Sequence, residues 1–144
     1  MRLEVDIRKT LQSGNRRFEL DATFSSQDDL TVVFGASGSG KSLTIQAIAG
    51  LVTPEHGKIV VDGAALFDGQ QGINLPARKR GVGYLFQDYA LFPHLTVREN
   101  IGYPLKKYLQ FNLLSDVREE IAEIMESFEI THLAESYPAE LSGG

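Results

Sequence analysis

A short glycine-rich run contains the residue types that bind phosphate groups. Residues 35–42 match the pattern G-x-x-x-x-G-K-[ST]. Glycine adopts backbone conformations that side chains forbid, so successive amide groups can point into one hollow. Lys41 would reach the β- and γ-phosphates of a nucleotide, and the Ser42 hydroxyl would bind Mg²⁺. The predicted phosphate-binding residues are Gly35, Ala36, Ser37, Gly38, Ser39, Gly40, Lys41, Ser42 and Leu43.

The segments on either side of this run fit that prediction. Leu30–Phe34 is apolar apart from Thr31, which is typical of a strand buried on both faces in a parallel sheet. A helical pattern begins at Lys41 and ends near Gly50, and the positive end of its dipole would add to the hollow. A glycine turn that binds nothing is the alternative. The order of strand, loop and helix favours the binding loop.

Alternating apolar residues predict strands near the amino end. Residues 2–10 and 18–24 alternate around a turn at 12–15, which indicates an antiparallel hairpin. Two shorter strands are predicted at 58–61 and 64–67, because the Asp-Gly pair between them is typical of a turn.

The second half of the chain combines one further strand with helices. Pro76–Arg80 carries three basic residues and is interpreted as a solvated turn, and Val82–Phe86 as an apolar strand. Thr96 and Glu99 form the pattern of a capping box at a helix start. Ser115–Phe128 has helical periodicity. Its apolar face would consist of Val117, Ile121, Ile124, Met125 and Phe128.

Composition excludes several classes of protein. The 144 residues are 42% apolar, enough for a domain with a core. A net charge of −5 disfavours nucleic acid as a partner, and the absence of cysteine excludes disulfides and thiolate metal sites. The sequence has no apolar run of membrane-spanning length and no signal-peptide pattern, so we expect a cytoplasmic chain.

Three motifs occur in an order that identifies a family. The run at 35–42, the triplet Phe86-Gln87-Asp88 and the terminal Leu141-Ser142-Gly143-Gly144 resemble the nucleotide-binding subunits of ABC transporters. The resemblance covers the whole chain but only the N-terminal part of the family's ATPase domain, so residues 1–144 are predicted to be one partial domain. It implies an α/β P-loop NTPase fold. That fold has an N-terminal antiparallel β subdomain, a partial parallel core sheet and the start of a helical subdomain.

The resemblance also implies roles for individual residues. Gln87 is similar to a glutamine that contacts Mg²⁺ and the attacking water and links the site to the membrane subunit. Gln87 and Lys41 are therefore the expected catalytic residues, and Ser42 and Gln87 the expected metal ligands. Ser142, Gly143 and Gly144 resemble the start of the signature motif, which meets the γ-phosphate of ATP held by the opposite subunit. ATP and Mg²⁺ are the implied cofactors.

The same resemblance implies the partners. They are a membrane permease, a second ATPase subunit in a head-to-tail pair and, indirectly, a solute-binding protein, with the chain at the cytoplasmic face of the membrane. Leu91–Val97 is similar to importers that use binding proteins, and residues 72–84 are most similar to the ATPases of molybdate importers. Importers of sulfate, ferric iron or sugars share much of this pattern and stay open as alternatives.

Two departures from the family pattern change the expectations. Residues 11–17 contain no aromatic side chain to stack on adenine, and Phe18 is assigned to the core by its alternation with Leu20. The sequence stops at Gly144, before the family's Walker B aspartate, catalytic glutamate and switch histidine. We therefore expect this chain to be truncated and to hydrolyse ATP weakly or not at all. A non-transport ABC protein, a small kinase or GTPase, and a nucleotide-binding module without hydrolysis are the alternative functions.

Overall fold

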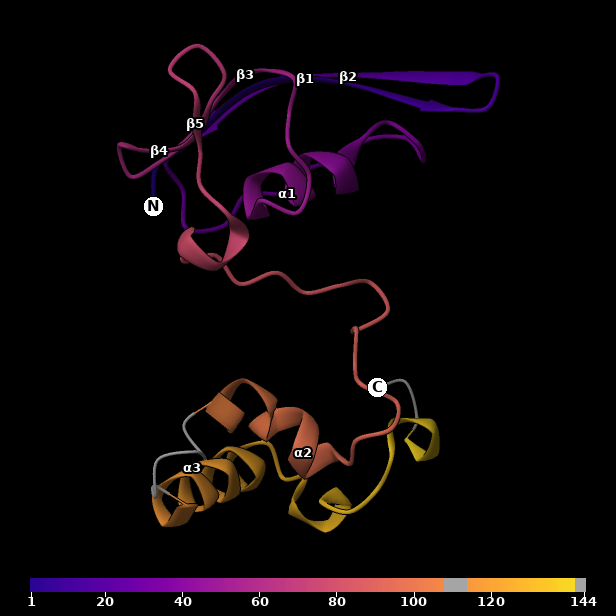
Figure 1. The fold of residues 1–144 in the computed structure, drawn as a ribbon, viewed down its shortest axis with the longest axis vertical. Helices are drawn as coiled ribbons and strands as arrows, with labels where there is room; N and C mark the ends of the chain where they lie inside the picture. Colours follow the sequence, from indigo (N-terminus) through magenta and orange to yellow (C-terminus); the bar gives the residue numbers. More distant parts are fainter. Residues whose placement is uncertain (108–113, 142–144) are drawn as a thin grey trace. The chain divides into compact units, whose positions relative to one another are not determined.

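The computed structural model describes residues 1–107 and 114–141. It divides the chain into two compact units, Met1–Tyr84 and Leu85–Gly144 (Figure 1). The first unit contains the strands β1–β5 and helix α1, and the second contains α2, α3 and short 3₁₀ turns. None of the helices in the described ranges is long and apolar enough to cross a membrane.

The first unit is built on a five-stranded sheet in the order β2-β1-β3-β4-β5. The predicted hairpin is confirmed, because β1 (Leu3–Ser13) and β2 (Arg16–Ser26) pair antiparallel along their whole length. The two shorter predicted strands are also present, as β3 (His56–Val61) and β4 (Ala64–Asp68). A two-residue strand, β5 (Ile73–Asn74), ends the sheet. Every pairing is antiparallel.

The core lies between one face of this sheet and α1 (Lys41–Ala49) (Figure 1). Alternation along β1 places its odd-numbered residues on the inner face, and Ile7 has no exposed surface. The helix ends at Gly50, whose left-handed conformation allows a Schellman motif, with Leu51 N donating to Gln46 O at 2.9 Å. The buried core residues are Leu3, Val5, Ile7, Leu20, Ala47, Ile59, Leu66 and Phe67.

Two predicted apolar strands, and with them the partial parallel sheet, are not formed. Residues 30–34 and 82–86 have no strand structure, and Leu30, Val32 and Phe34 are 80%, 77% and 97% exposed. A strand forms by hydrogen bonding to a neighbouring strand. An apolar composition only makes burial of the segment favourable. Among the described residues no strand pairs with either segment. The composition was therefore an insufficient basis for predicting these strands.

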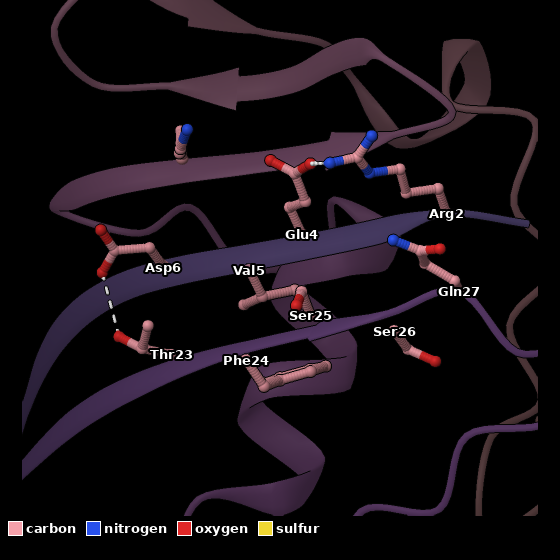
Figure 2. A pocket seen from close by; sticks show the side chains of 10 residues that line it. Arg2, Glu4, Val5, Asp6, Thr23, Phe24, Ser25, Ser26 and Gln27 are labelled. Atoms are coloured by element: carbon pink, nitrogen blue, oxygen red, sulfur yellow. Dashed lines mark hydrogen bonds and ion pairs between the residues drawn. The ribbon is translucent and has the colours of Figure 1, made fainter.

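The outer face of the sheet is polar and carries a hollow of about 410 Å³ (Figure 2). Even-numbered residues of β1 line it, with Glu4 paired to Arg2 at 3.0 Å and Asp6 accepting from Thr23 Oγ1 at 3.1 Å. These acidic groups already have partners on the sheet. The hollow lies on the face of the sheet opposite the one that packs against α1, so it is separate from the glycine-rich run.

The second unit is helical. Its helix α2 (Val97–Gly102) begins with the predicted capping box, in which Glu99 N donates to Thr96 Oγ1 and Thr96 N donates to the Glu99 carboxylate. The predicted amphipathic helix is α3 (Leu114–Ser127), and Met125 on its apolar face is buried as expected. Phe128 was predicted on that face as well, but it lies beyond the end of the helix and is 71% exposed.

Candidate nucleotide-binding site

The glycine-rich run forms a compact loop that leads directly into α1. Its turn is closed by a hydrogen bond from Ser39 N to Ala36 O at 3.2 Å. Gly38 and Gly40 have φ angles of 78° and 93°, in the left-handed region that favours glycine. The loop residues from Ala36 to Ser39 are exposed, so an anion can reach them from solvent. The predicted strand before the loop is absent, but the loop itself and the helix after it are as predicted.

The start of α1 offers unpaired amide groups and positive charge. The amides of Lys41, Ser42 and Leu43 have no acceptor within the helix, because its first hydrogen bond runs from Thr44 N to Gly40 O. Gly40 has no side chain to cap them, and the first turn contains no acidic residue. The Lys41 ammonium group donates to Gly35 O at 2.8 Å and to Ala36 O at 2.6 Å. These groups together favour an anion at this helix start.

The loop is fixed from behind by close packing against β2. Gly40 lies so near Leu20 and Phe18 that an added Cβ would be 2.6 Å from Leu20 Cδ1 and 3.1 Å from Phe18 Cζ. The buried Thr44 hydroxyl donates to Gly40 O at 3.0 Å. Leu43 faces the core, and Ser42 is exposed at the loop. The predicted phosphate-binding residues thus lie together in a loop that packs against β2, and the Ser42 hydroxyl is accessible to a hydrated cation.

We expect Gly40→Ala to destabilise the protein by about 2–4 kcal/mol. The new methyl group adds overpacking against a buried leucine to the strain of a left-handed alanine. Gly38→Ala is the matched control, since φ is also positive there but no atom lies within 4 Å of the added carbon. Strain alone should cost this control about 1–2 kcal/mol. Urea unfolding followed by circular dichroism measures the free energy of unfolding of both variants. Equal losses of stability would show that the packing of Gly40 against Leu20 and Phe18 is unimportant.

Arg80 corrects the interpretation of Pro76–Arg80 as a solvated turn. The segment contains a short 3₁₀ turn, Ala77–Lys79, in which Arg78 and Lys79 are exposed as predicted. Arg80 instead is only 7% exposed and donates to carbonyl groups at the end of α1. Burial lowers the pKa of Arg80 below its usual value, yet an arginine stays protonated at any physiological pH. Composition did not distinguish Arg80 from its two neighbours, because the α1 carbonyl groups that bury it lie more than 30 residues earlier in the chain.

The other predicted site residues belong to the second unit or lie outside the described residues. Gln87 is exposed and opens a turn in which Tyr89 N donates to Phe86 O at 3.0 Å. Ser142, Gly143 and Gly144 lie outside the described residues, so their predicted contact with a nucleotide stays a prediction. Phe18 packs partly buried against the core, as its alternation predicted, and the adenine-stacking position stays unassigned.

A comparison with protein families decides the class of this chain. The family model described as ABC transporter matches residues 20–144, which include the phosphate loop. The chain belongs to the ABC transporter family. This result confirms the family inferred from the three motifs and excludes the small kinases and GTPases that share only the loop.

Curated relatives within the ABC transporter family are named for molybdenum import. The molybdenum import ATP-binding protein ModC of Rhizobium meliloti (strain 1021) is 40% identical over 144 residues, which are 100% of this chain and 38% of that protein. The protein of the same name from Vibrio parahaemolyticus serotype O3:K6 is 37% identical over 146 residues, covering 100% of this chain and 36% of that protein. The chain thus spans little more than a third of the length of these relatives.

Solved ABC cassettes share the fold. The ATP-binding cassette MJ0796, in a dimeric post-hydrolysis state bound to ADP and Pi, superimposes with a TM-score of 0.71 at 25% identity. The match covers 99% of this chain and 64% of the cassette. A second dimeric structure of the same bacterial ABC transporter cassette gives a TM-score of 0.70. The predicted fold class is therefore confirmed, apart from the parallel strands that the described residues do not form.

Proposed function

We propose that this chain is the N-terminal part of the ATP-binding subunit of an ABC importer for molybdate. The observation that carries the proposal is the exposed loop at 35–42, where the free helix-start amides and the Lys41 ammonium group lie together at the start of α1. The names of the relatives support the solute. In the complete protein, ATP binding and hydrolysis would drive uptake through a membrane permease, with the subunit at the cytoplasmic face of the membrane.

Within this proposal the residues of the loop bind and orient the triphosphate. The backbone amides of Gly38 and of Gly40 to Leu43 donate to phosphate oxygens, and Lys41 exchanges its two carbonyl acceptors for the terminal phosphates. Ser42 would hold Mg²⁺, and the ion would neutralise charge on the phosphates. Gln87 keeps the role that the family resemblance implies for it, as a contact of Mg²⁺ and of the attacking water. Ser142, Gly143 and Gly144 would donate to the γ-phosphate of ATP in a second, head-to-tail subunit.

Calorimetric titration of the 144-residue chain with Mg·ATP and Mg·GTP tests nucleotide binding. We expect weak binding of ATP, because one side of the proposed site belongs to a second subunit. ATP should be preferred over GTP. Much stronger binding of GTP than of ATP would contradict the proposal. So would a heat of binding that is unchanged in Lys41→Glu, which reverses the charge at this position.

The proposed solute requires a test in the complete protein. Co-expressed with its permease, the complete subunit should co-purify with the membrane fraction. In proteoliposomes containing the solute-binding protein, labelled molybdate should be taken up when ATP is present. Uptake of sulfate, ferric iron or a sugar in place of molybdate would support the importer function and contradict molybdate as the solute. Capture of ribosomes or DNA without a permease would contradict the importer function.

A further inference from the structure

Arg80 makes a set of hydrogen bonds at the end of α1 opposite the phosphate loop. Its guanidinium group donates from Nη1 to Ala47 O at 2.7 Å and to Ile48 O at 2.9 Å. It also donates from Nε to Leu75 O at 2.7 Å and from Nη2 to Asn74 Oδ1 at 3.1 Å. All three nitrogen atoms of the guanidinium group donate hydrogen bonds. Only a planar, forked side chain can place three donor atoms in this way at one site.

The charge of this arginine is compensated by a helix end and not by a carboxylate. Within the described residues no acidic group pairs with Arg80. The final carbonyl groups of a helix carry partial negative charge, and a buried cation there is stabilised. The Schellman motif of α1 already uses Gln46 O and Ala47 O, and Arg80 supplies a donor to Ile48 O as well.

The surrounding atoms leave Arg80 little freedom to move. A Cβ added to Gly50 would lie 2.5 Å from Arg80 Nε, so the helix end and the guanidinium group are in close contact. Asn74, which accepts from Arg80, donates to Thr53 Oγ1 at 3.3 Å. The arginine therefore joins the end of α1 to the segment that follows β4.

We infer that Arg80 is a positioning residue for nucleotide binding, which it serves by fixing the carboxyl end of the helix whose amino end forms the phosphate loop. The inference rests on the proposed function. Helix α1 has only 9 residues and is about 14 Å long, so a rotation or shift at one end displaces the other end. Packing of Gly40 on Leu20 holds the amino end, and Arg80 holds the carboxyl end. Release of the second anchor lets the free amides leave the orientation that phosphate needs.

Substitution of Arg80 tests this inference through nucleotide affinity. At a temperature where circular dichroism shows each protein fully folded, Arg80→Met should weaken Mg·ATP binding about fivefold or more, since small misplacements of binding groups are costly. Arg80→Lys should rescue little, because an ammonium group keeps the charge without the fork. The matched controls are Arg78→Met and Lys79→Met, which remove the same charge from exposed positions in the same turn. They should bind ATP within about twofold of the original chain.

Hydrogen exchange gives a second measure that does not depend on nucleotide. Arg80→Met should speed exchange of the two hydrogen-bonded amides within residues 36–44, those of Ser39 and Thr44, about fivefold or more, while residues 16–26 of β2 exchange as before. If Arg80→Met does not fold, Asn74→Ala removes one acceptor and should produce a smaller change in the same peptides. Exchange that increases only in residues 46–52 and 74–80, with unchanged ATP affinity, would reduce Arg80 to a local stabilising role and overturn the inference. If the original chain itself does not bind ATP, the proposed function fails for this chain, and exchange in residues 36–44 still decides the role of Arg80.

Discussion

Lys41→Met is expected to weaken Mg·ATP binding by at least about tenfold. Hydrogen bonds to a charged group contribute about 1.5–3 kcal/mol, and about 1.4 kcal/mol corresponds to a factor of ten in affinity. The Lys41 ammonium group donates to Gly35 O and Ala36 O, so the phosphates must replace these acceptors and the net loss lies toward the lower end of that range. Titration with a fluorescent ATP analogue measures the effect.

Substitution of an exposed lysine elsewhere in the chain distinguishes the effect of local contact with ATP from the effect of overall charge. Lys58 lies on the outer face of the sheet, beside the polar hollow, and is exposed. Lys58→Met removes the same charge at a distance from the loop and should leave affinity unchanged within about twofold, because salt screens distant exposed charges. Unfolding in urea should show that both variants are folded. Equal losses of affinity in the two variants would mean that ATP binding depends on net charge and not on the loop.

Gly57→Ala is expected to cause the largest loss of stability, at least about 3 kcal/mol. Gly57 has a φ angle of 97° at the start of β3, where it pairs with Ile7 of β1. An added Cβ would overlap the carbonyl oxygen of Asp6, and a backbone atom in the centre of a sheet cannot move aside as a side chain can. Urea unfolding followed by circular dichroism gives the free energy of unfolding.

The turn between β3 and β4 supplies the control for this substitution. Gly63 also has a positive φ, 81°, but no atom lies within 4 Å of an added Cβ. Gly63→Ala should therefore cost only the conformational strain, about 1–2 kcal/mol. A Gly57→Ala protein no less stable than Gly63→Ala would show that β1 and β3 do not approach as closely as described.

Local sequence patterns predicted the elements whose stabilising contacts lie close along the chain. The β1–β2 hairpin follows from alternation on both sides of a short turn. The capping box at Thr96 joins residues only three positions apart. The phosphate loop is the same kind of feature, because its shape depends on glycine dihedral angles and on the helix that directly follows it. These features could be derived without knowledge of the rest of the fold.

Features that depend on distant partners were decided only by the tertiary structure. Residues 30–34 are apolar enough for a buried strand, but strand structure needs a neighbour, and the described residues supply none. Phe128 continues the apolar spacing of α3, but its exposure depends on where that helix ends. Arg80 is indistinguishable from Arg78 and Lys79 in the sequence, and its burial is set by carbonyl groups on α1.

The sequence by itself thus identified the family and predicted the phosphate loop, because a motif of fixed spacing carries its own geometry. The tertiary structure decided how that loop is supported, through Leu20 and Phe18 behind Gly40 and through Arg80 at the far end of α1. The physical reason is one of range. Backbone dihedral preferences act between neighbours in the chain, whereas burial and buried hydrogen bonds join residues that only the fold brings together.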